Sequence, residues 1–396
     1  MSTLAAPARQ PRSRKAALPM VALKVTRRRF ASAALHEVRM HGRLEAAGFG
    51  AHPHVTRLVE SFVHEGHVGL AFALHGRDLR RSMKDGGLPL AKVKHVTRQL
   101  LEALAALHEA GVIHADVKPD NILYHAASGV ARLSDLGLSE TSLEVGEAIA
   151  TQDYAPPEAL LGTPMTAPVD LWALGCTVFE MITGSLLFDP WAACCAKYRE
   201  FSNDDEEGEE TQEPATTPSR AELDDAEEKR EQFATGSILG GKYQLVQRLG
   251  QGKFATVWKA RPLHDEALLL PPAEQVREQA RALRATLPPL PPRARWNLYD
   301  VALGYEHLVQ MHELLGPAPA ALMQGCWNKL FCGADNTSLR FAPEVQSRPL
   351  SERLATALPP EEARAAATFL EALLRYEPAQ RVTAAEALKM AWLRLP

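Results

Sequence analysis

The stretch His-Ala-Asp-Val-Lys-Pro-Asp-Asn, at residues 114–121, is the part of this 396-residue chain that decides its fold. A second short motif, Asp-Leu-Gly, follows at residues 135–137. Together the two motifs place a carboxylate base, a cation and two oxygen-bearing metal ligands within about one hairpin of each other. Because few other reactions need all four groups, this combination favours phosphoryl transfer from a magnesium nucleotide to a hydroxyl group.

Composition and charge exclude several classes of protein. A chain of this length suffices for one two-lobed enzyme or two modest domains, and 46% hydrophobic residues can form a sizeable core. The net charge of −4 gives no sign of nucleic acid as a direct partner. Five cysteines, an odd number without Cys-x-x-Cys spacing, argue against a disulfide framework or a zinc site.

The sequence contains no apolar run of the roughly 18 residues that a membrane span needs. Residues 1–19 are rich in Arg, Ser and Ala and lack acidic residues. We interpret them as a disordered basic tail, with a weak transit peptide as the alternative. We therefore expect a cytoplasmic protein, with the nucleus as a second compartment and no membrane partner.

Hydrophobic periodicity predicts a strand-rich beginning followed by helices. The expected strands are residues 21–25, 58–62 and 67–74, and the expected helices are residues 31–44, 93–110 and 170–183. Further along, residues 202–232 are acidic and almost free of large apolar side chains, which is typical of a disordered linker. Residues 241–261 then have a strand–turn–strand pattern, and helices are expected again at residues 273–285, 307–315, 363–374 and 383–393.

Further motifs surround the opening pair. They are Val-Ala-Leu-Lys at residues 21–24, Leu-His-Glu-Val-Arg at 35–39, Thr-Gln-Asp-Tyr-Ala-Pro-Pro-Glu at 151–158 and Asp-Leu-Trp-Ala-Leu-Gly at 170–175. With them the chain resembles the eukaryotic-type serine/threonine protein kinases over most of its length. The resemblance implies an α+β fold of two lobes, a small β-rich N-lobe and a larger helical C-lobe. It also implies that Glu158 pairs with Arg381.

The resemblance assigns roles to the residues of the two opening motifs. Asp116 matches the catalytic aspartate that accepts or orients the substrate hydroxyl, and Lys118 would neutralise charge developing on the γ-phosphate of ATP. Asn121 and Asp135 would bind Mg²⁺, which prefers oxygen ligands. An enzyme that uses ATP and Mg²⁺ to phosphorylate a protein substrate is therefore expected.

Four more residues are expected to bind the nucleotide. Lys24 matches the strand lysine that contacts the α- and β-phosphates, and Glu37 would orient its ammonium group. Phe72 and Leu74 lie where the family places the residues at the back and the hinge of the adenine site.

The glycine-rich loop expected shortly before Lys24 is absent, because residues 1–19 contain no glycine. A copy occurs far downstream, where Leu249, Gly250, Gly252 and Val257 match its positions. The glycines would let backbone amides approach the phosphates, and Val257 would cover the adenine. We expect residues 241–262 to dock beside the strand at residues 21–25. An ordinary hairpin, or a rearranged gene model, is the alternative.

Two further features concern the kind of kinase. The downstream loop resembles that of SR-protein-specific kinases, which implies an Arg/Ser-rich, splicing-type protein substrate and a monomeric enzyme. Ala115 replaces the arginine that usually follows the loop histidine and binds a phosphorylated activation loop, so we expect constitutive activity. A catalytically impaired pseudokinase scaffold is the alternative, since the glycine loop is out of order. A small-molecule kinase is disfavoured by residues 151–158.

These patterns divide the chain into segments. The expected segments are a disordered basic tail (1–19), a partial N-lobe (20–80), the first part of the C-lobe with the catalytic and activation loops (81–190), an acidic disordered linker (191–240), a glycine-loop hairpin (241–262), a Pro-rich connector (263–295) and the helical remainder of the C-lobe (296–396).

Overall fold

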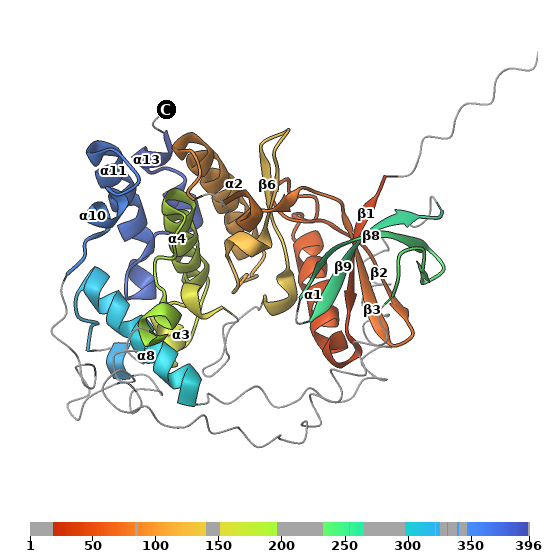
Figure 1. The fold of residues 1–396 in the computed structure, drawn as a ribbon, viewed down its shortest axis with the longest axis horizontal. Coiled ribbons are helices and arrows are strands. Elements are labelled where there is room, and N and C mark those ends of the chain that lie inside the picture. The colour runs from red at the N-terminus through yellow and green to blue at the C-terminus, as the bar shows by residue number, and fades with distance from the viewer. Residues whose placement is uncertain are drawn as a thin grey trace, which may run out of the picture.

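The computed structural model describes residues 19–83, 86–139, 151–195, 233–252, 254–264, 298–320, 322–324, 331, 339 and 347–394. These residues form two lobes: a twisted sheet with one helix against it, and a larger, mostly helical body (Figure 1). The expected two-lobed kinase fold is confirmed. Within the described residues, no helix is long and apolar enough to cross a membrane.

The N-lobe is built on a six-stranded antiparallel sheet with the order β2-β3-β1-β9-β8-β7. Helix α1 packs on it, because Ala34 and Val38 of α1 join an apolar cluster with Leu70 and Phe72 of β3. The elements are β1 (Val21–Thr26), α1 (Ala31–Ala46), β2 (Leu58–His64), β3 (His67–Ala73), β7 (Ile238–Leu239), β8 (Tyr243–Gln251) and β9 (Ala255–Pro262).

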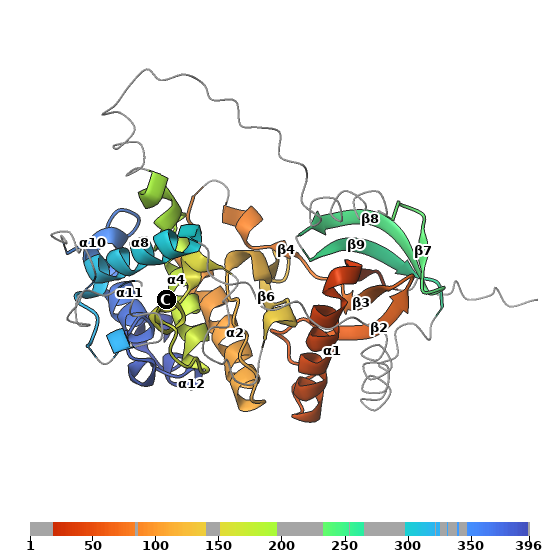
Figure 2. The ribbon, with the colours of Figure 1, turned by 90° about the horizontal axis from the view of Figure 1, so that it is seen from below.

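Two distant parts of the sequence meet in this sheet. Strand β9 pairs antiparallel with β1, in a register that runs from Val21 opposite Ala260 to Thr26 opposite Ala255. Figure 2 shows β8 and β9, in green, against the red and orange strands of the N-lobe. The hairpin therefore lies beside the strand that carries Lys24, as the sequence predicted.

The C-lobe surrounds helix α4, whose residues are almost all buried. Helices α2 and α11 both pack against it. A small sheet of β4, β5 and β6 lies between this body and the N-lobe (Figure 1). The bounds are β4 (Arg77–Asp78), α2 (Leu90–Glu109), β5 (Ile122–His125), β6 (Val130–Leu133), α3 (Pro157–Leu161), α4 (Pro168–Thr183), α8 (Leu298–Leu315), α10 (Leu350–Leu354), α11 (Pro360–Leu373), α12 (Ala384–Ala387) and α13 (Ala391–Arg394).

The structure corrects the prediction of one helix over residues 383–393. A capping box at Thr383 and Glu386 starts α12, but the helix ends at Ala387 and a separate α13 follows. The ring of Trp392 in α13 packs on Phe369 of α11, with 4.6 Å between ring centroids. Tertiary packing at this corner thus outweighs the local helical pattern.

The bounds of the expected linker also change. Residues 191–195 are helical, and β7 lies within the other end of residues 191–240. The basic tail up to residue 18, residues 196–232 and the predicted helix at residues 273–285 lie outside the described residues.

Candidate active site

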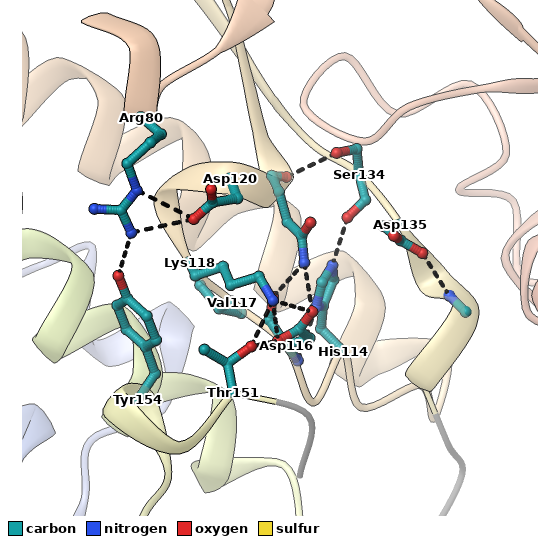
Figure 3. A network of polar contacts seen from close by, with 12 residues as sticks. Arg80, His114, Asp116, Val117, Lys118, Asp120, Ser134, Asp135, Thr151 and Tyr154 are labelled. Atoms are coloured by element: carbon teal, nitrogen blue, oxygen red, sulfur yellow. Dashed lines mark hydrogen bonds and ion pairs between the residues drawn. The ribbon is translucent and has the colours of Figure 1, made fainter. Parts of the chain in front are cut away.

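Asp116 is the centre of a hydrogen-bond network in the loop after α2 (Figure 3). Its Oδ2 accepts from Nδ2 of Asn121 at 2.7 Å, and its Oδ1 accepts from the Thr151 hydroxyl at 2.8 Å. Nζ of Lys118 lies 2.8 Å from Oδ2 of the same carboxylate. Asp116 is only 9% exposed, so little water competes with these three partners, and together they fix the orientation of its carboxylate.

Hydrogen bonds to Asp170 of α4 hold the loop that carries Asp116. The fully buried Asp170 carboxylate accepts from the backbone N–H groups of His114 at 2.9 Å and Ala115 at 2.8 Å, and contacts Nε2 of His108 at 2.8 Å. Burial favours the neutral acid, but these hydrogen bonds together hold the pKa of Asp170 below its ordinary value. Ala115 has a positive φ of 64°, a conformation that L-residues rarely adopt, so the anchor also holds a strained backbone.

A second charged group links the two lobes. Nζ of Lys24 on β1 lies 2.8 Å from Oε2 of Glu37 on α1 and 2.8 Å from Oδ1 of Asp135. Burial alone would lower the pKa of Lys24, but the two carboxylates raise it above its ordinary value. Burial raises the pKa of Glu37 against the opposing charge of Lys24. The ammonium group is therefore held charged and aimed between α1 and the Asp-Leu-Gly turn.

Asp135 occupies an unusual backbone position directly after β6. It has a left-handed φ of 67°, and its Oδ1 accepts from the N–H of Gly137 at 3.2 Å. A Cβ on Gly137 would come within 3.0 Å of that same oxygen, so glycine keeps the turn open. Although burial would raise the pKa of Asp135, the charge of Lys24 lowers it, and the carboxylate stays ionised.

The back of the predicted adenine site is apolar. Phe72 at the end of β3 is 9% exposed and packs against α1, with its ring centroid 5.6 Å from that of His41. Leu74 follows β3 and is half-buried. The next turn approaches β5 closely, because a Cβ on Gly76 would lie 1.8 Å from the backbone oxygen of Tyr124.

The glycine-loop residues lie on the hairpin next to Lys24. Val257 of β9 is directly opposite Lys24 in the ladder, and Gly250 of β8 is opposite Val257. A Cβ on Gly250 would meet no atom within 4 Å, so the packing of the protein does not itself require glycine there. The N–H of Gly252 donates to the carbonyl of Ala255 at 2.9 Å and closes the turn.

The structure therefore brings the predicted residues together in three groups. Lys24, Glu37 and Asp135 form one ion-paired cluster. The catalytic loop supplies a second group, Asp116, Lys118 and Asn121. The third comprises the hairpin residues Leu249, Gly250, Gly252 and Val257 together with Phe72 and Leu74, which lie on or directly after strands of the N-lobe sheet.

A comparison with protein families identifies the fold. The family model described as "Protein kinase domain" matches residues 6–226, more than half of the chain. The chain belongs to the protein kinase family. It is similar to the serine/threonine-protein kinase prp4 of Schizosaccharomyces pombe, with 32% identity over 160 residues, which are 39% of this chain and 34% of that protein.

Two further kinases are similar over comparable stretches. Human dual specificity tyrosine-phosphorylation-regulated kinase 3 is 33% identical over 175 residues, which are 42% of this chain and 30% of that protein. Dual specificity protein kinase YAK1 of Saccharomyces cerevisiae is 36% identical over 140 residues, which are 34% of this chain and 17% of that protein. The kinase chain thus spans about a third, or less, of the length of these relatives.

The side-chain oxygens of Asn121 and Asp135 are suitable ligands for magnesium. Asn121 uses its amide N–H on Asp116, and Asp135 uses Oδ1 on Lys24. In the described part of the chain, Oδ1 of Asn121 and Oδ2 of Asp135 accept no side-chain hydrogen bond, because the bonds of these two residues use Nδ2 and Oδ1, respectively. One amide and one carboxylate oxygen fit Mg²⁺, which keeps several waters and binds substrate phosphates as well.

Sequence reasoning quoted Thr151 and Tyr154 within a motif but missed what they bind. Thr151 donates a hydrogen bond to the Asp116 carboxylate, as described above. Tyr154 donates to Glu180 of α4 at 2.5 Å. It also accepts from the Arg80 guanidinium at 2.6 Å, and Arg80 reaches Asp120 at 3.1 Å (Figure 3). Arg80 gives no signal in the sequence, because this contact joins segments 40 to 100 residues apart.

One predicted pair is confirmed. Arg381 and Glu158 are both fully buried, and their two bonds are each 2.6 Å long. This bidentate pair joins the start of α3 to the segment that precedes α12.

Proposed function

We propose that this chain is an active protein kinase that transfers the γ-phosphoryl group of ATP to serine or threonine of a protein. One observation carries the proposal: Lys24, Glu37 and Asp135 are ion-paired, and Asp116 is hydrogen-bonded to three partners in the same structure. A scaffold that had lost catalysis would not need both charged clusters in place.

The catalytic loop supplies the proton acceptor. Asp116 takes the proton of the substrate hydroxyl or orients that hydroxyl toward the phosphorus. Asn121 and Thr151 hold the carboxylate, so that it needs no reorientation when the substrate binds. Lys118 lies beside it and stabilises negative charge that develops on the transferred group.

The nucleotide lies between the lobes in this proposal. Lys24 binds its phosphates, and Glu37 keeps the ammonium group in place. Asn121 and Asp135 would hold Mg²⁺, which supplies a positive charge that neutralises the phosphate oxygens.

The downstream hairpin covers the phosphates. The ladder places Val257 against Lys24, and Gly250 has open space where a side chain would project. The open space at Gly250 would let phosphate oxygens approach the backbone of the turn, and Val257 and Leu249 would contact the base.

We propose Arg/Ser-rich proteins as the substrate class. Acidic side chains near the catalytic loop favour a basic substrate. Asp120 and Glu180 are already paired with Arg80, whereas Asp153 lies close to Asp189 and Glu180. Burial is the main cause that raises the pKa of Asp153, the charges of Asp189 and Glu180 add to it, and the cations Arg80 and Lys118 oppose it.

A kinase assay with the full chain tests the proposal. Serine peptides rich in arginine are compared with peptides in which lysine or glutamine replaces arginine, in Mg-ATP, followed by phosphoamino-acid analysis. Asp116→Ala serves as the control, and it should lower kcat by several orders of magnitude while Mg-ATP still binds. Equal activity of Asp116→Ala and the natural chain would overturn the mechanism, and equal use of the three peptides would overturn the substrate class.

A further inference from the structure

The N-lobe sheet consists of two chain segments that only meet in space. Strands β1, β2 and β3 come from residues 21–73, whereas β7, β8 and β9 come from residues 238–262. Everything that joins them in the sheet is non-covalent. Without the hairpin, β1 would be an edge strand with a row of unpaired backbone groups.

The contact between these segments resembles a protein interior. Six residues of β1 are in register with β9, from Val21 opposite Ala260 to Thr26 opposite Ala255. Apolar side chains from both sides form one cluster, and each is at most 7% exposed: Val21, Leu23, Val25, Ala71, Leu239, Tyr243, Leu245, Trp258 and Ala260. The hairpin thus pairs with the backbone groups at the edge of β1 and, at the same time, buries the apolar side chains of this cluster.

A buried polar contact fixes the position of the hairpin. Glu60 of β2 is 8% exposed, and its carboxylate accepts from the hydroxyl of fully buried Tyr243 at 2.9 Å and from Nζ of Lys242. The Tyr243 ring stacks on Phe62 of β2, with 5.5 Å between centroids and 16° between planes. Gly240 adds a steric condition, because a Cβ there would lie 2.6 Å from the Phe62 ring.

The far end of the hairpin is also held. The backbone N–H of Arg27 donates to the carbonyl of Phe254 at 3.0 Å, and the Phe254 ring meets Phe30 edge to face at 4.9 Å. From the C-lobe side, the Arg81 guanidinium donates to the carbonyl of Leu249 at 3.4 Å. Both ends and one long side of the hairpin therefore contact other parts of the protein.

We propose that the edge of β1, together with Glu60 and Phe62, is a self-sufficient docking surface whose occupant is the β-hairpin of residues 233–264. The hairpin is a separate module that stays bound through its non-covalent contacts alone, without its covalent connections to the C-lobe. The function of the module, covering the nucleotide, rests on the proposed kinase activity; its docking does not.

Cutting the chain on both sides of the hairpin tests the proposal. Recognition sequences for a site-specific protease are inserted after Ala215 and after Ala280 of the full chain, and a denaturing gel confirms that both are cut. We expect the released segment to elute with the body in gel filtration at about 1 µM, because it pairs with the whole of β1 and shares a buried apolar cluster with it. Separation of the segment from a folded body overturns the proposal.

A matched pair of substitutions identifies the contact responsible. Tyr243→Phe removes the hydroxyl that Glu60 binds. Tyr305→Phe is the control, since the Tyr305 hydroxyl on α8 has no partner among the described residues. In the cut protein, Tyr243→Phe should speed dissociation of the hairpin about tenfold, because a hydrogen bond to a charged acceptor is lost. Tyr305→Phe should leave dissociation unchanged.

The same variants behave differently in the uncut chain. There the hairpin is covalently joined to the rest of the chain, which makes its docking intramolecular, so a tenfold weaker contact still leaves it docked. Tyr243→Phe should therefore reduce Mg-ATP binding in the cut protein but barely in the intact one. An equal loss in both forms would contradict the proposal. If the cut hairpin stays bound but neither form binds Mg-ATP, docking is supported and the proposed kinase activity fails.

Discussion

Asp170→Asn is the most informative single substitution in the C-lobe. The change keeps the shape of a side chain that is fully buried in α4. It replaces one carboxylate oxygen by an NH₂ group, while the two oxygens accept from different backbone N–H groups, those of His114 and Ala115. Whichever way the amide is turned, one backbone donor then faces another donor.

The magnitude follows from these contacts. A hydrogen bond to a charged group contributes about 1.5–3 kcal/mol, and an unpaired buried donor adds a cost of its own. The loss of one such bond and the weakening of the others should lower the free energy of unfolding by about 3 kcal/mol, or roughly a hundredfold in the folding equilibrium. Because His114 and Ala115 directly precede Asp116, the catalytic carboxylate should also lose its fixed position.

Two measurements check this prediction. Urea denaturation gives the change in the free energy of unfolding, and steady-state kinetics separate kcat from the affinity for Mg-ATP. We expect kcat to fall by roughly a hundredfold through misplacement of Asp116, while Mg-ATP binding changes little. Glu361→Gln, at a side chain that is 93% exposed, is the control and should change neither quantity. A free energy of unfolding within 0.5 kcal/mol of the natural protein, as is usual for surface changes, would refute the reasoning.

Two other substitutions test separate parts of the structure. Glu158→Gln leaves the fully buried Arg381 without its carboxylate and should cost about 3–5 kcal/mol in urea denaturation; an unchanged midpoint would show that the pair contributes nothing. Ala115→Arg places a guanidinium in the apolar cluster of Ile113, Met165 and Val169 and should destabilise the fold by about 3 kcal/mol in urea denaturation. Phosphatase treatment of the natural chain should leave its kinase activity within about twofold, because Ala115 cannot bind a phosphorylated loop.

The pH dependence of stability has a definite sign at one buried histidine. Burial lowers the pKa of His41 to about 3, while the unfolded chain titrates near the ordinary value of 6.5. Below pH 6.5 the unfolded state therefore binds a proton at His41 that the folded state does not bind, and the free energy of unfolding decreases as the pH falls toward 3. The slope is about 1.4 kcal/mol per pH unit for this one group. His41→Phe should remove that part of the slope in urea titrations at pH 6, 5 and 4, and an unchanged slope would contradict the assignment.

The sequence predicted which residues gather at the candidate site better than it predicted the packing contacts around them. The resemblance to protein kinases assigned roles to Asp116, Asn121, Lys24 and Asp135, and the structure shows Asn121 bonded to Asp116 and Asp135 paired with Lys24. The pairing of β9 with β1 could also be foreseen, since the strand of Lys24 lacked a partner and the only glycine-rich hairpin was downstream.

The contacts of Arg80 and the break between α12 and α13 could not be foreseen. Arg80 binds Asp120, Tyr154 and Glu180 only because the fold brings four distant positions together. The break depends on where Trp392 finds space against α11. Neither leaves a local pattern, because both arise from packing between elements and not from periodicity within one.

Hydrogen exchange of the intact chain with and without Mg-ATP tests the central claim most directly, that the downstream hairpin completes the nucleotide site beside Lys24. The account predicts that Mg-ATP slows exchange in three separate peptides at once, covering residues 21–26, 135–139 and 249–257. Protection of the first two without any change at residues 249–257 would contradict it, because the nucleotide would then bind without the hairpin.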